Sequence, residues 1–350
     1  MNENKPKVIK PEMLILAREA RGLTQSELAE RLGITQGQVS KIESSILPFQ
    51  DCDISKLESA LGYPESFYYR DWNREVSNFL FRASPKAKAS ENSQVCARIT
   101  ILKNQIRELV NSLERKNSPL PRMAVEDIEG GPIGIARVVR KILRLPPGPI
   151  EKLVKIIEGA GCIVVPFDFM TAKIDACCDR IDGIIPVIFA NMNACRSRLR
   201  FSIAHELGHL IMHDYTSEEA EKEADLFAAE FLLPDSESRQ MLLPLSIQRM
   251  VDLKLHWKVS MFAILTSARK RGLLSDYQSN RLHSEYMFRY KYNEPVEEFM
   301  PKEEPQLLRK ITNIYKDELH YSPSEIGQKI SLFEHEVLST FDGSLMRVVV

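Results

Sequence analysis

The amino-terminal part of the chain alternates short helical patterns with glycine stops. In LILAREARGLTQSELAERLGITQGQVSKIES, residues 14–44, apolar residues recur at helical spacing in three pieces, which Gly22 and Gly33 separate. The pattern predicts one helix from about Gln25 to Leu32 and another from about Gln36 to Glu43. The tight turn between these helices makes a helix-turn-helix arrangement.

Paired side chains mark both helix starts. Thr24 with Glu27, and Thr35 with Gln38, have the spacing of a capping box, in which side chains satisfy free amides at the start of a helix. Ala29 is small enough to let the two helices cross closely. We expect a small core that contains Leu28, Ala29, Leu32, Ile34, Val39 and Ile42.

The outward face of the second of these helices is polar. It carries Gln36, Gln38, Ser40 and Lys41, and Gln25 stands at the start of the preceding helix. Glutamine and lysine side chains suit the edges of adenine and guanine in the major groove, and a side chain at a helix start suits a phosphate. We therefore expect these residues to contact double-stranded DNA. A small helical bundle with a solvated polar face is the alternative interpretation.

Farther along the chain, the patterns indicate more helices and a small β-sheet. Residues 82–93, RASPKAKASENS, have no apolar period and predict a connector. Residues 94–115 have apolar positions at near-heptad spacing and predict a helix for core packing or dimer formation. IARVVRKILRLPPGPIEKLVKIIEGAG predicts two helices broken by prolines, and GCIVVPF and IDGIIPVIFAN predict strands. We expect a multidomain, mainly α fold with a small β-sheet.

Two histidines stand four residues apart in RFSIAHELGHLIMHD. On one helix, His205 and His209 lie one turn apart on one face, so their imidazoles can converge on a single metal ion. Glu206 stands where a carboxylate can reach water at that ion. His213 continues the series, but at 1.5 Å per residue it lies about 12 Å from His205 along the helix axis, too far to share the ion.

A second helix is expected to supply the third ligand. TSEEAEKEADLFAAEFLLP predicts a helix that Thr216 and Glu219 open and that ends before a proline. Glu221 and Asp225 are four residues apart on one face of this helix. Glu221 can bind the metal, and Asp225 can accept the far ring N–H of a ligand histidine.

The donor types favour zinc. Two histidine nitrogens and one carboxylate leave an open position, which is typical of a catalytic rather than a closed structural zinc site. These donors favour zinc over magnesium or calcium, and manganese or iron stays an alternative. Glu223 and Glu218 are alternative carboxylate ligands. Two amphipathic helices with incidental histidines are the alternative to a metal site.

Composition narrows the class of protein. The 350 residues, 44% of them hydrophobic and 27% charged, suit a soluble globular protein of two or three domains. The chain has no apolar run that spans a membrane and no secretory signal at its start, so we expect a cytoplasmic protein without a membrane partner. The net charge of -1 neither supports nor excludes DNA binding. The six cysteines are expected to be free thiols, with Cys177 and Cys178 structural or incidental.

The amino-terminal segment resembles a known DNA-binding family. Roughly residues 14–69, including LTQSELAERLGITQGQVSKIE, are similar to the helix-turn-helix of the XRE family, which is related to phage Cro and repressor proteins. The resemblance implies a five-helix domain whose Gln36 helix reads the major groove. It also implies a homodimer on a pseudo-palindromic operator.

The central region resembles the ImmA/IrrE family, a gluzincin-like group of metallopeptidases with an α+β zincin-like fold. RLRFSIAHELGHLIMH and EAEKEADLFAAEFLLP carry the resemblance, which extends over most of the chain in the arrangement of fused XRE regulators. It implies His205, His209 and Glu221 as Zn²⁺ ligands and Glu206 as the general base. The family commonly has asparagine where this chain has Asp225.

These resemblances imply a DNA-binding transcriptional regulator with zinc-dependent endopeptidase activity. Its expected protein substrate is a transcriptional repressor, in stress response or in the control of mobile elements. The strand GIIPVIFAN is expected to lie along the cleft and pair with an extended substrate, and His213, Tyr215 and His256 are candidates for stabilising the oxyanion or for structural roles. In the alternative function, the metallopeptidase-like domain is a non-catalytic sensor of a metal or ligand. An antitoxin-like partner protein is a third possibility.

The carboxyl-terminal part of the chain is less informative. Residues 253–274 predict a helical bundle that covers the cleft or forms a second helix-turn-helix-like unit, and the tail predicts mixed helix and a final RVVV strand. The expected division begins with a DNA-binding domain at 1–70 and a connector at 71–93. A metallopeptidase domain with the following bundle occupies 94–290. The region at 291–350 has no role that the sequence identifies, and cleft closure or dimer contacts are the simplest ones for it.

Overall fold

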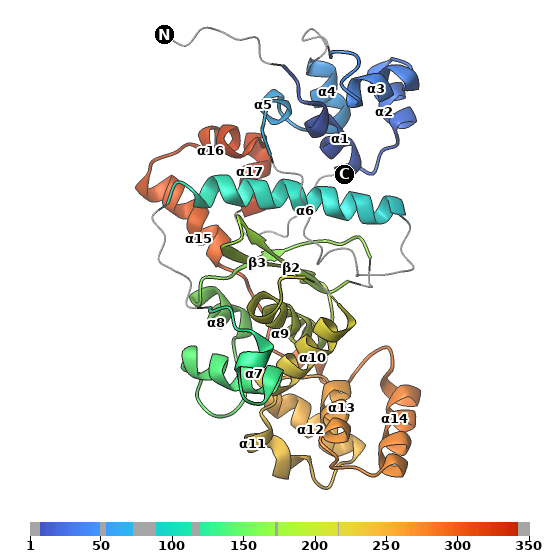
Figure 1. The fold of residues 1–350 in the computed structure, drawn as a ribbon, viewed down its shortest axis with the longest axis vertical. Coiled ribbons are helices and arrows are strands. Elements are labelled where there is room, and N and C mark those ends of the chain that lie inside the picture. The colour runs from blue at the N-terminus through green and yellow to red at the C-terminus, as the bar shows by residue number, and fades with distance from the viewer. Residues whose placement is uncertain are drawn as a thin grey trace. The chain divides into compact units, whose positions relative to one another are not determined.

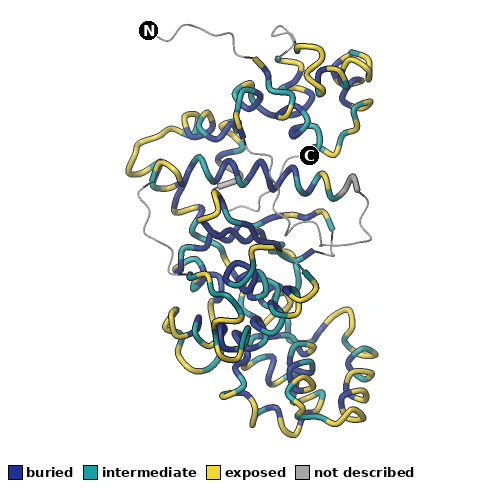
Figure 2. The backbone as a smooth tube through the Cα atoms, viewed as in Figure 1, coloured by how far each residue is buried: buried dark blue, intermediate teal, exposed yellow. Residues whose placement is uncertain are grey.

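The computed structural model describes residues 8–49, 54–72, 89–113, 120–171, 174–215 and 217–341. Helices dominate these residues and three strands form one small sheet, which confirms the expected fold class (Figure 1). None of the helices in these ranges is both long enough and apolar enough to cross a membrane. The chain forms two compact units: unit 1 is Met1–Arg115 with Leu308–Val350, and unit 2 is Lys116–Leu307. Each unit has its own buried core (Figure 2).

Five helices form the amino-terminal part of unit 1. They are α1 (Pro11–Ala20), α2 (Gln25–Leu32), α3 (Gln36–Glu43), α4 (Ile54–Leu61) and α5 (Glu65–Tyr68). The bounds of α2 and α3 agree with the predicted helices, and capping boxes are present at Thr24 and Thr35. Gly33 has a φ of 68°, the left-handed conformation that ends α2 and turns the chain toward α3. Ile34 is partly buried, and the other expected core residues, Leu28, Ala29, Leu32, Val39 and Ile42, are fully buried.

A long helix and the carboxyl-terminal helices complete unit 1. They are α6 (Ala89–Val110), α15 (Leu307–Asn313) with a π-helical turn (Ile314–Glu318), α16 (Pro323–Ile330) and α17 (Glu334–Phe341). The helix α6 packs on α1 and α16, and its Ala97 and Ile101 join the apolar cluster of the first five helices. The Tyr315 hydroxyl donates a hydrogen bond of 2.7 Å to the main-chain oxygen of Leu109 in α6.

Arg70 joins the end of α5 to α16. Its guanidinium donates hydrogen bonds of 2.6 and 2.8 Å to the main-chain oxygens of Gln328 and Lys329, and one of 2.7 Å to the Ser331 hydroxyl. Carbonyl groups in the last turn of a helix have no partner within the helix, so the arginine satisfies them. The amino-terminal and carboxyl-terminal segments of unit 1 therefore contact each other here.

The compact units divide the chain differently from the expected domains. The helix expected at 94–115 begins at Ala89, inside the expected connector, and belongs to unit 1, where it packs on α1 and α16. Conversely, residues 291–307 belong to unit 2. The physical reason is that the apolar face of α6 is buried against α1 and α16. Residues 82–88 of the connector and the RVVV segment lie outside the described residues.

The sheet of unit 2 has β3 in its middle. β1 (Ile163–Pro166) pairs in parallel with β3 (Ile185–Ala190), and β2 (Ala176–Ile181) pairs with β3 in antiparallel orientation. Both edges of β3 are occupied, so the expectation that GIIPVIFAN pairs with a substrate is wrong. The edge strand β2 was not predicted from the sequence, because polar Asp179 and Arg180 interrupt its apolar pattern. Within the described residues, the outer edge of β2 has no strand partner.

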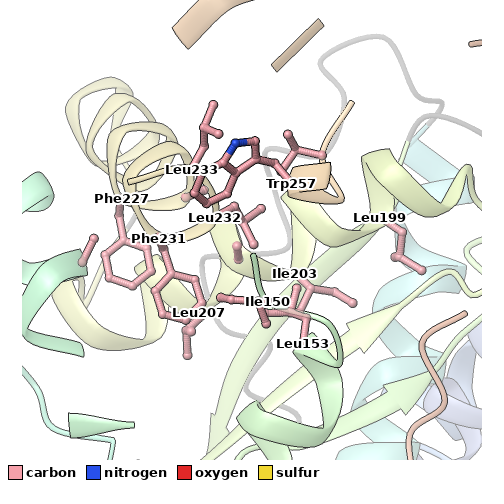
Figure 3. Close-up of a cluster of buried hydrophobic side chains, with 14 of the residues drawn as sticks. Ile150, Leu153, Leu199, Ile203, Leu207, Phe227, Phe231, Leu232, Leu233 and Trp257 are labelled. Atoms are coloured by element: carbon pink, nitrogen blue, oxygen red, sulfur yellow. The ribbon is translucent and has the colours of Figure 1, made fainter. Parts of the chain in front are cut away.

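Helices make up most of the rest of unit 2. They are α7 (Gly131–Ile142), α8 (Leu153–Gly159), α9 (Arg196–Met212), α10 (Glu218–Leu232), α11 (Asp235–Ser238), α12 (Ile247–Trp257), α13 (Met261–Lys270) and α14 (Asp276–Tyr290), with 3-10 turns at Val125–Asp127, Arg239–Leu242 and Glu297–Phe299. The helix α9 packs against β2, β3 and α10, and α10 also packs against α7. Figure 3 shows Leu207 of α9, Phe231 of α10 and Trp257 of α12 in the shared core. The turn from α12 to α13, residues 258–260, is as long as the turn 33–35 between α2 and α3.

The start of α10 differs from the prediction by one residue. Ser217 is the cap, and its hydroxyl accepts a hydrogen bond of 3.0 Å from the Ala220 N–H. The predicted cap, Thr216, lies outside the described residues. The helix ends at Leu232, before the proline, as the sequence predicts.

Glu303 fastens the acidic segment after α14 to two helices of unit 2. Its carboxylate accepts hydrogen bonds of 3.2 and 2.9 Å from the N–H groups of Leu153 and Val154, at the start of α8. It also forms an ion pair with Arg200, whose side chain is fully buried in α9. A carboxylate at a helix start satisfies free amides and interacts favourably with the helix dipole.

Glu294 and Glu297 repeat this arrangement around one lysine. The fully buried Lys254 ammonium lies 2.9 Å from Glu294 and 2.6 Å from Glu297. Glu294 also accepts a hydrogen bond from the N–H of Met261 at 2.9 Å, and Glu297 accepts one from the N–H of Ser197 at 2.7 Å. The segment 294–303 is thus an internal fastening of unit 2.

We predict that Glu303→Ala lowers the free energy of unfolding by about 3–5 kcal/mol, because it leaves the buried Arg200 guanidinium without its counter-ion. Urea unfolding followed by circular dichroism measures the change. Glu304→Ala is the matched control: the Glu304 side chain is 61% exposed, so its loss should change stability by no more than about 0.5 kcal/mol. Equal effects of the two variants would contradict the proposed importance of this ion pair.

Candidate metal centre and nucleic-acid interface

Two helices bring His205, His209 and Glu221 together. The Nε2 atoms of the two histidines lie 3.0 Å apart, and oxygens of Glu221 lie 3.4 Å from His205 Nε2 and 3.5 Å from His209 Nε2. Atoms bonded at about 2 Å to a tetrahedral ion lie roughly 3.3 Å apart, so these donors have the separations of a metal site. Among the described residues, this trio is the group of His, Cys, Asp and Glu side chains that could hold a metal ion.

Gly208 lets α9 and α10 approach closely beside the trio. A Cβ atom at this position would lie 3.0 Å from the Phe227 ring and 3.4 Å from the Cα atom of Ala224. Phe227 and Phe231 stack with their ring centroids 5.5 Å apart, and both are fully buried. The glycine within HELGH therefore removes the side chain that would hold Glu221 away from the histidines.

Each histidine of the trio has a hydrogen-bond partner at its other ring nitrogen. His205 Nδ1 lies 3.0 Å from Asp225 Oδ1, the contact expected of a carboxylate that orients a metal ligand. His209 Nδ1 lies 3.0 Å from Nδ1 of His213, whose Nε2 lies 2.9 Å from the Glu223 carboxylate. Glu223 therefore contacts His213 and does not join the trio.

Carboxylates give the site a preference for positive charge. Burial lowers the pKa of His205, but hydrogen bonds with Asp225 and Glu221 and the charge of Glu206 outweigh it and raise this pKa to about 10. Burial and the positive charge of His205 lower the pKa of His209 to about 3. The same negative charges that hold a proton on His205 would attract a divalent cation. The donor set thus fits a metal such as zinc.

Glu206 contacts the edge strand β2. Its carboxylate accepts hydrogen bonds from the thiol and the main-chain N–H of Cys178. Burial raises the pKa of Glu206, while the charge of His205 and the thiol hydrogen bond oppose this increase. Burial also raises the pKa of Cys178, so its sulfur keeps a proton to donate. This contact could not be predicted from the sequence, because the polar positions of β2 hide the strand to which Cys178 belongs.

The remaining candidates from the sequence are largely exposed. Glu218 is exposed at the first position of α10, and the Tyr215 side chain is 69% exposed. His256 is exposed on α12, with its ring centroid 5.2 Å from that of Trp257. The trio therefore favours Glu221 over Glu218 as the carboxylate ligand, and oxyanion stabilisation by His213, Tyr215 or His256 stays a prediction.

In unit 1, hydrogen bonds hold the polar side chains between α2 and α3. Gln36 Nε2 donates to Gln25 Oε1 at 2.8 Å, and Gln25 Nε2 donates to the Glu43 carboxylate at 2.8 Å. Glu43 also pairs with Arg18 of α1 at 2.6 Å. The network fixes Gln25 and Gln36 relative to each other at the amino-terminal ends of their helices.

The side chains predicted to contact DNA differ in exposure and in hydrogen bonding. Gln36 and Lys41 are exposed, and Ser40 is half-buried. Gln38 is also exposed, but its side-chain oxygen accepts a hydrogen bond of 2.9 Å from the Thr35 N–H, which closes the capping box. Gln36 and Lys41 are therefore exposed side chains outside the capping box, and Gln36 is held by its hydrogen bond to Gln25.

The small sheet, the HELGH helix and the Glu221 helix together define a metallopeptidase-like domain, and a helix-turn-helix domain precedes it. The family model of the IrrE N-terminal-like domain matches residues 157–268, and a helix-turn-helix family model matches residues 14–68. The chain is therefore the predicted fusion of an XRE-type helix-turn-helix with an ImmA/IrrE-type metallopeptidase domain. No curated protein and no solved structure matches it.

We predict about one zinc ion per chain in the purified protein, measured by elemental analysis. His205→Ala and Glu221→Ala should lose the ion, because each removes one of only three protein donors. Glu219→Ala is the control on the same helix, since the Glu219 side chain is 71% exposed and lies outside the trio. Zinc retained in Glu221→Ala and lost in Glu223→Ala would show that Glu221 is not the ligand.

Proposed function

We propose that this chain is a DNA-binding transcriptional regulator with zinc-dependent endopeptidase activity, and that its substrate is a transcriptional repressor. The placement of Glu206 supports this proposal best. It lies next to one residue of the trio in sequence, is not a member of the trio, and contacts the edge strand β2. This is where a hydrolytic metal site needs a general base.

The residues of the site can divide the reaction among them. His205, His209 and Glu221 would hold the zinc ion, which when bound supplies a Lewis acid that polarises a peptide carbonyl and acidifies water. Glu206 takes the proton from the attacking water and later delivers it to the leaving amine. Asp225 holds the His205 ring in place during both steps.

An extended substrate would bind along the outer edge of β2. An edge strand can pair with an added strand, and Glu206 lies against the edge strand β2 through its hydrogen bonds from Cys178. A peptide bound there would pass the carboxylate that moves the proton. Repressor recognition fits an extended segment, because β-pairing selects an accessible strand rather than a folded surface.

The helix-turn-helix would direct the protein to an operator as a homodimer, with Gln36 and Lys41 reaching the major groove. A regulator in which the metal domain only senses a metal or ligand would use the same trio. That function gives no role to Glu206, so we favour the endopeptidase. The resemblance to the ImmA/IrrE family supports a role in stress response or in the control of mobile elements.

We predict that Glu206→Gln keeps its fold and its zinc but loses peptidase activity by roughly 100-fold or more, because an amide cannot accept the proton of water. Mass spectrometry of new protein termini, in cells that express either form, detects the cleavage and identifies its substrate. Those termini should appear with the wild type and be absent with the variant.

His205→Ala provides the comparison that separates an enzyme from a sensor. An endopeptidase loses regulation of its target genes in both variants. If regulation were normal with Glu206→Gln and absent with His205→Ala, the metal would act without catalysis and the endopeptidase proposal would fail.

We predict that Gln36→Ala and Lys41→Ala each weaken binding to a DNA duplex selected with the wild-type protein. The measurement is fluorescence anisotropy over a range of salt concentrations, and the salt dependence should decrease by about one unit of slope in Lys41→Ala if it contacts a phosphate. Lys155→Ala, an exposed lysine on α8, is the charge-matched control. Unchanged binding in both α3 variants would indicate that another surface contacts DNA.

A further inference from the structure

His213 and Glu223 form a contact with the metal trio that the proposed function does not use. His213 directly follows α9 and its side chain is 8% exposed; the Glu223 side chain, on α10, is 21% exposed. Nitrogen atoms of His213 lie 3.0 Å from His209 Nδ1 and 2.9 Å from a Glu223 oxygen. One imidazole therefore stands between His209 and a carboxylate.

The Glu223 carboxylate determines which ring nitrogens of His213 and His209 carry protons. An ionised carboxylate only accepts hydrogen bonds, so His213 must carry a proton on Nε2 to donate to Glu223. A neutral imidazole then has its lone pair on Nδ1, which accepts the Nδ1–H of His209. The remaining lone pair of His209 is on Nε2, the atom that faces His205 and Glu221.

The opposite arrangement would disable the ligand. If His213 carried its proton on Nδ1, His209 Nδ1 would accept it and the proton of His209 would move to Nε2. That proton would occupy the direction in which Nε2 must bind the metal, only 3.0 Å from His205 Nε2. Glu223 thus selects the tautomer of His209 that can bind.

We propose that Glu223 and His213 are positioning residues that fix the tautomer and the ring orientation of His209 for metal binding. The proposal rests on the metal centre described above. Asp225 orients His205 directly, whereas Glu223 orients His209 through an intervening imidazole. Glu221, Glu223 and Asp225 all lie on α10, so this one helix provides a metal ligand and orients both histidines.

The test compares two substitutions of His213 by their zinc affinity. Asn places an acceptor oxygen near the position of Nδ1, whereas Leu removes the acceptor but keeps a similar volume. Competition with a chromophoric zinc chelator should show affinity reduced about 10- to 100-fold in His213→Leu and close to wild type in His213→Asn. With cobalt in place of zinc, the visible absorption bands should shift in the Leu variant only.

A role in packing alone would give a different result, because both variants would lose thermal stability without a difference in zinc affinity. Equal affinities of the two variants therefore overturn the proposal. Nitrogen-15 NMR of histidine in the zinc-loaded wild type provides a test that needs no variant at His213. The expected His213 tautomer carries its proton on Nε2, and Glu223→Ala should mix the tautomers; a proton on Nδ1 in the wild type would overturn the proposal.

These measurements distinguish the metal centre from the relay, which is the set of contacts from Glu223 through His213 to His209. If the wild type binds no zinc, both the metal centre and the relay fail. If the wild type and all variants bind zinc equally, only the relay fails. Loss of the proposed peptidase function would leave zinc affinity and tautomers unchanged.

Discussion

The close crossing of α9 and α10 is the constraint on which the site depends. The histidines and Glu221 lie on different helices, so the distance between these helices decides whether three donor atoms can share one ion. Metal–ligand distances tolerate only about 0.2 Å of error, and a single Cβ at Gly208 would press against Phe227 at 3.0 Å. The glycine between the ligands is therefore as much a part of the geometry as the ligands.

Acidic residues support the metal centre in two places of unit 2, at the crossing of α9 and α10 and in the segment 294–303. Glu221, Glu223 and Asp225 contact the histidines at this crossing, while the segment 294–303 holds the starts of α8, α9 and α13. Both groups place carboxylates against groups that carry positive charge or free N–H donors. The second group accepts a hydrogen bond from the Ser197 N–H at the start of α9 and pairs with Arg200 in the same helix, so it keeps in place the helix that carries HELGH.

The sequence predicted what local geometry determines. Caps and apolar spacing were sufficient for α2, α3 and the end of α10, and helical spacing placed His205 and His209 on one face. The sequence did not predict β2, whose polar positions resemble a loop, or its contact with Glu206. Nor did it predict that Glu303 reaches Leu153, because that contact joins positions 150 residues apart and no local pattern records it. The domain boundaries differed for the same reason: the partners of α6 come from both ends of the chain.

This topology changes how the helix-turn-helix should be regarded. Residues 116–307 are connected to unit 1 at both of their ends, so they form an insertion rather than a domain at the end of one linker. If one linker joined two domains, proteolytic cleavage of that linker would separate them. Cleavage within unit 2 instead leaves both chain segments of unit 1 present. Those segments would still be joined by the packing of α6 on α16 and by the hydrogen bonds that Arg70, after α5, donates to the end of α16. The helix-turn-helix is therefore part of a compact unit that also contains the residues from Leu308 onward.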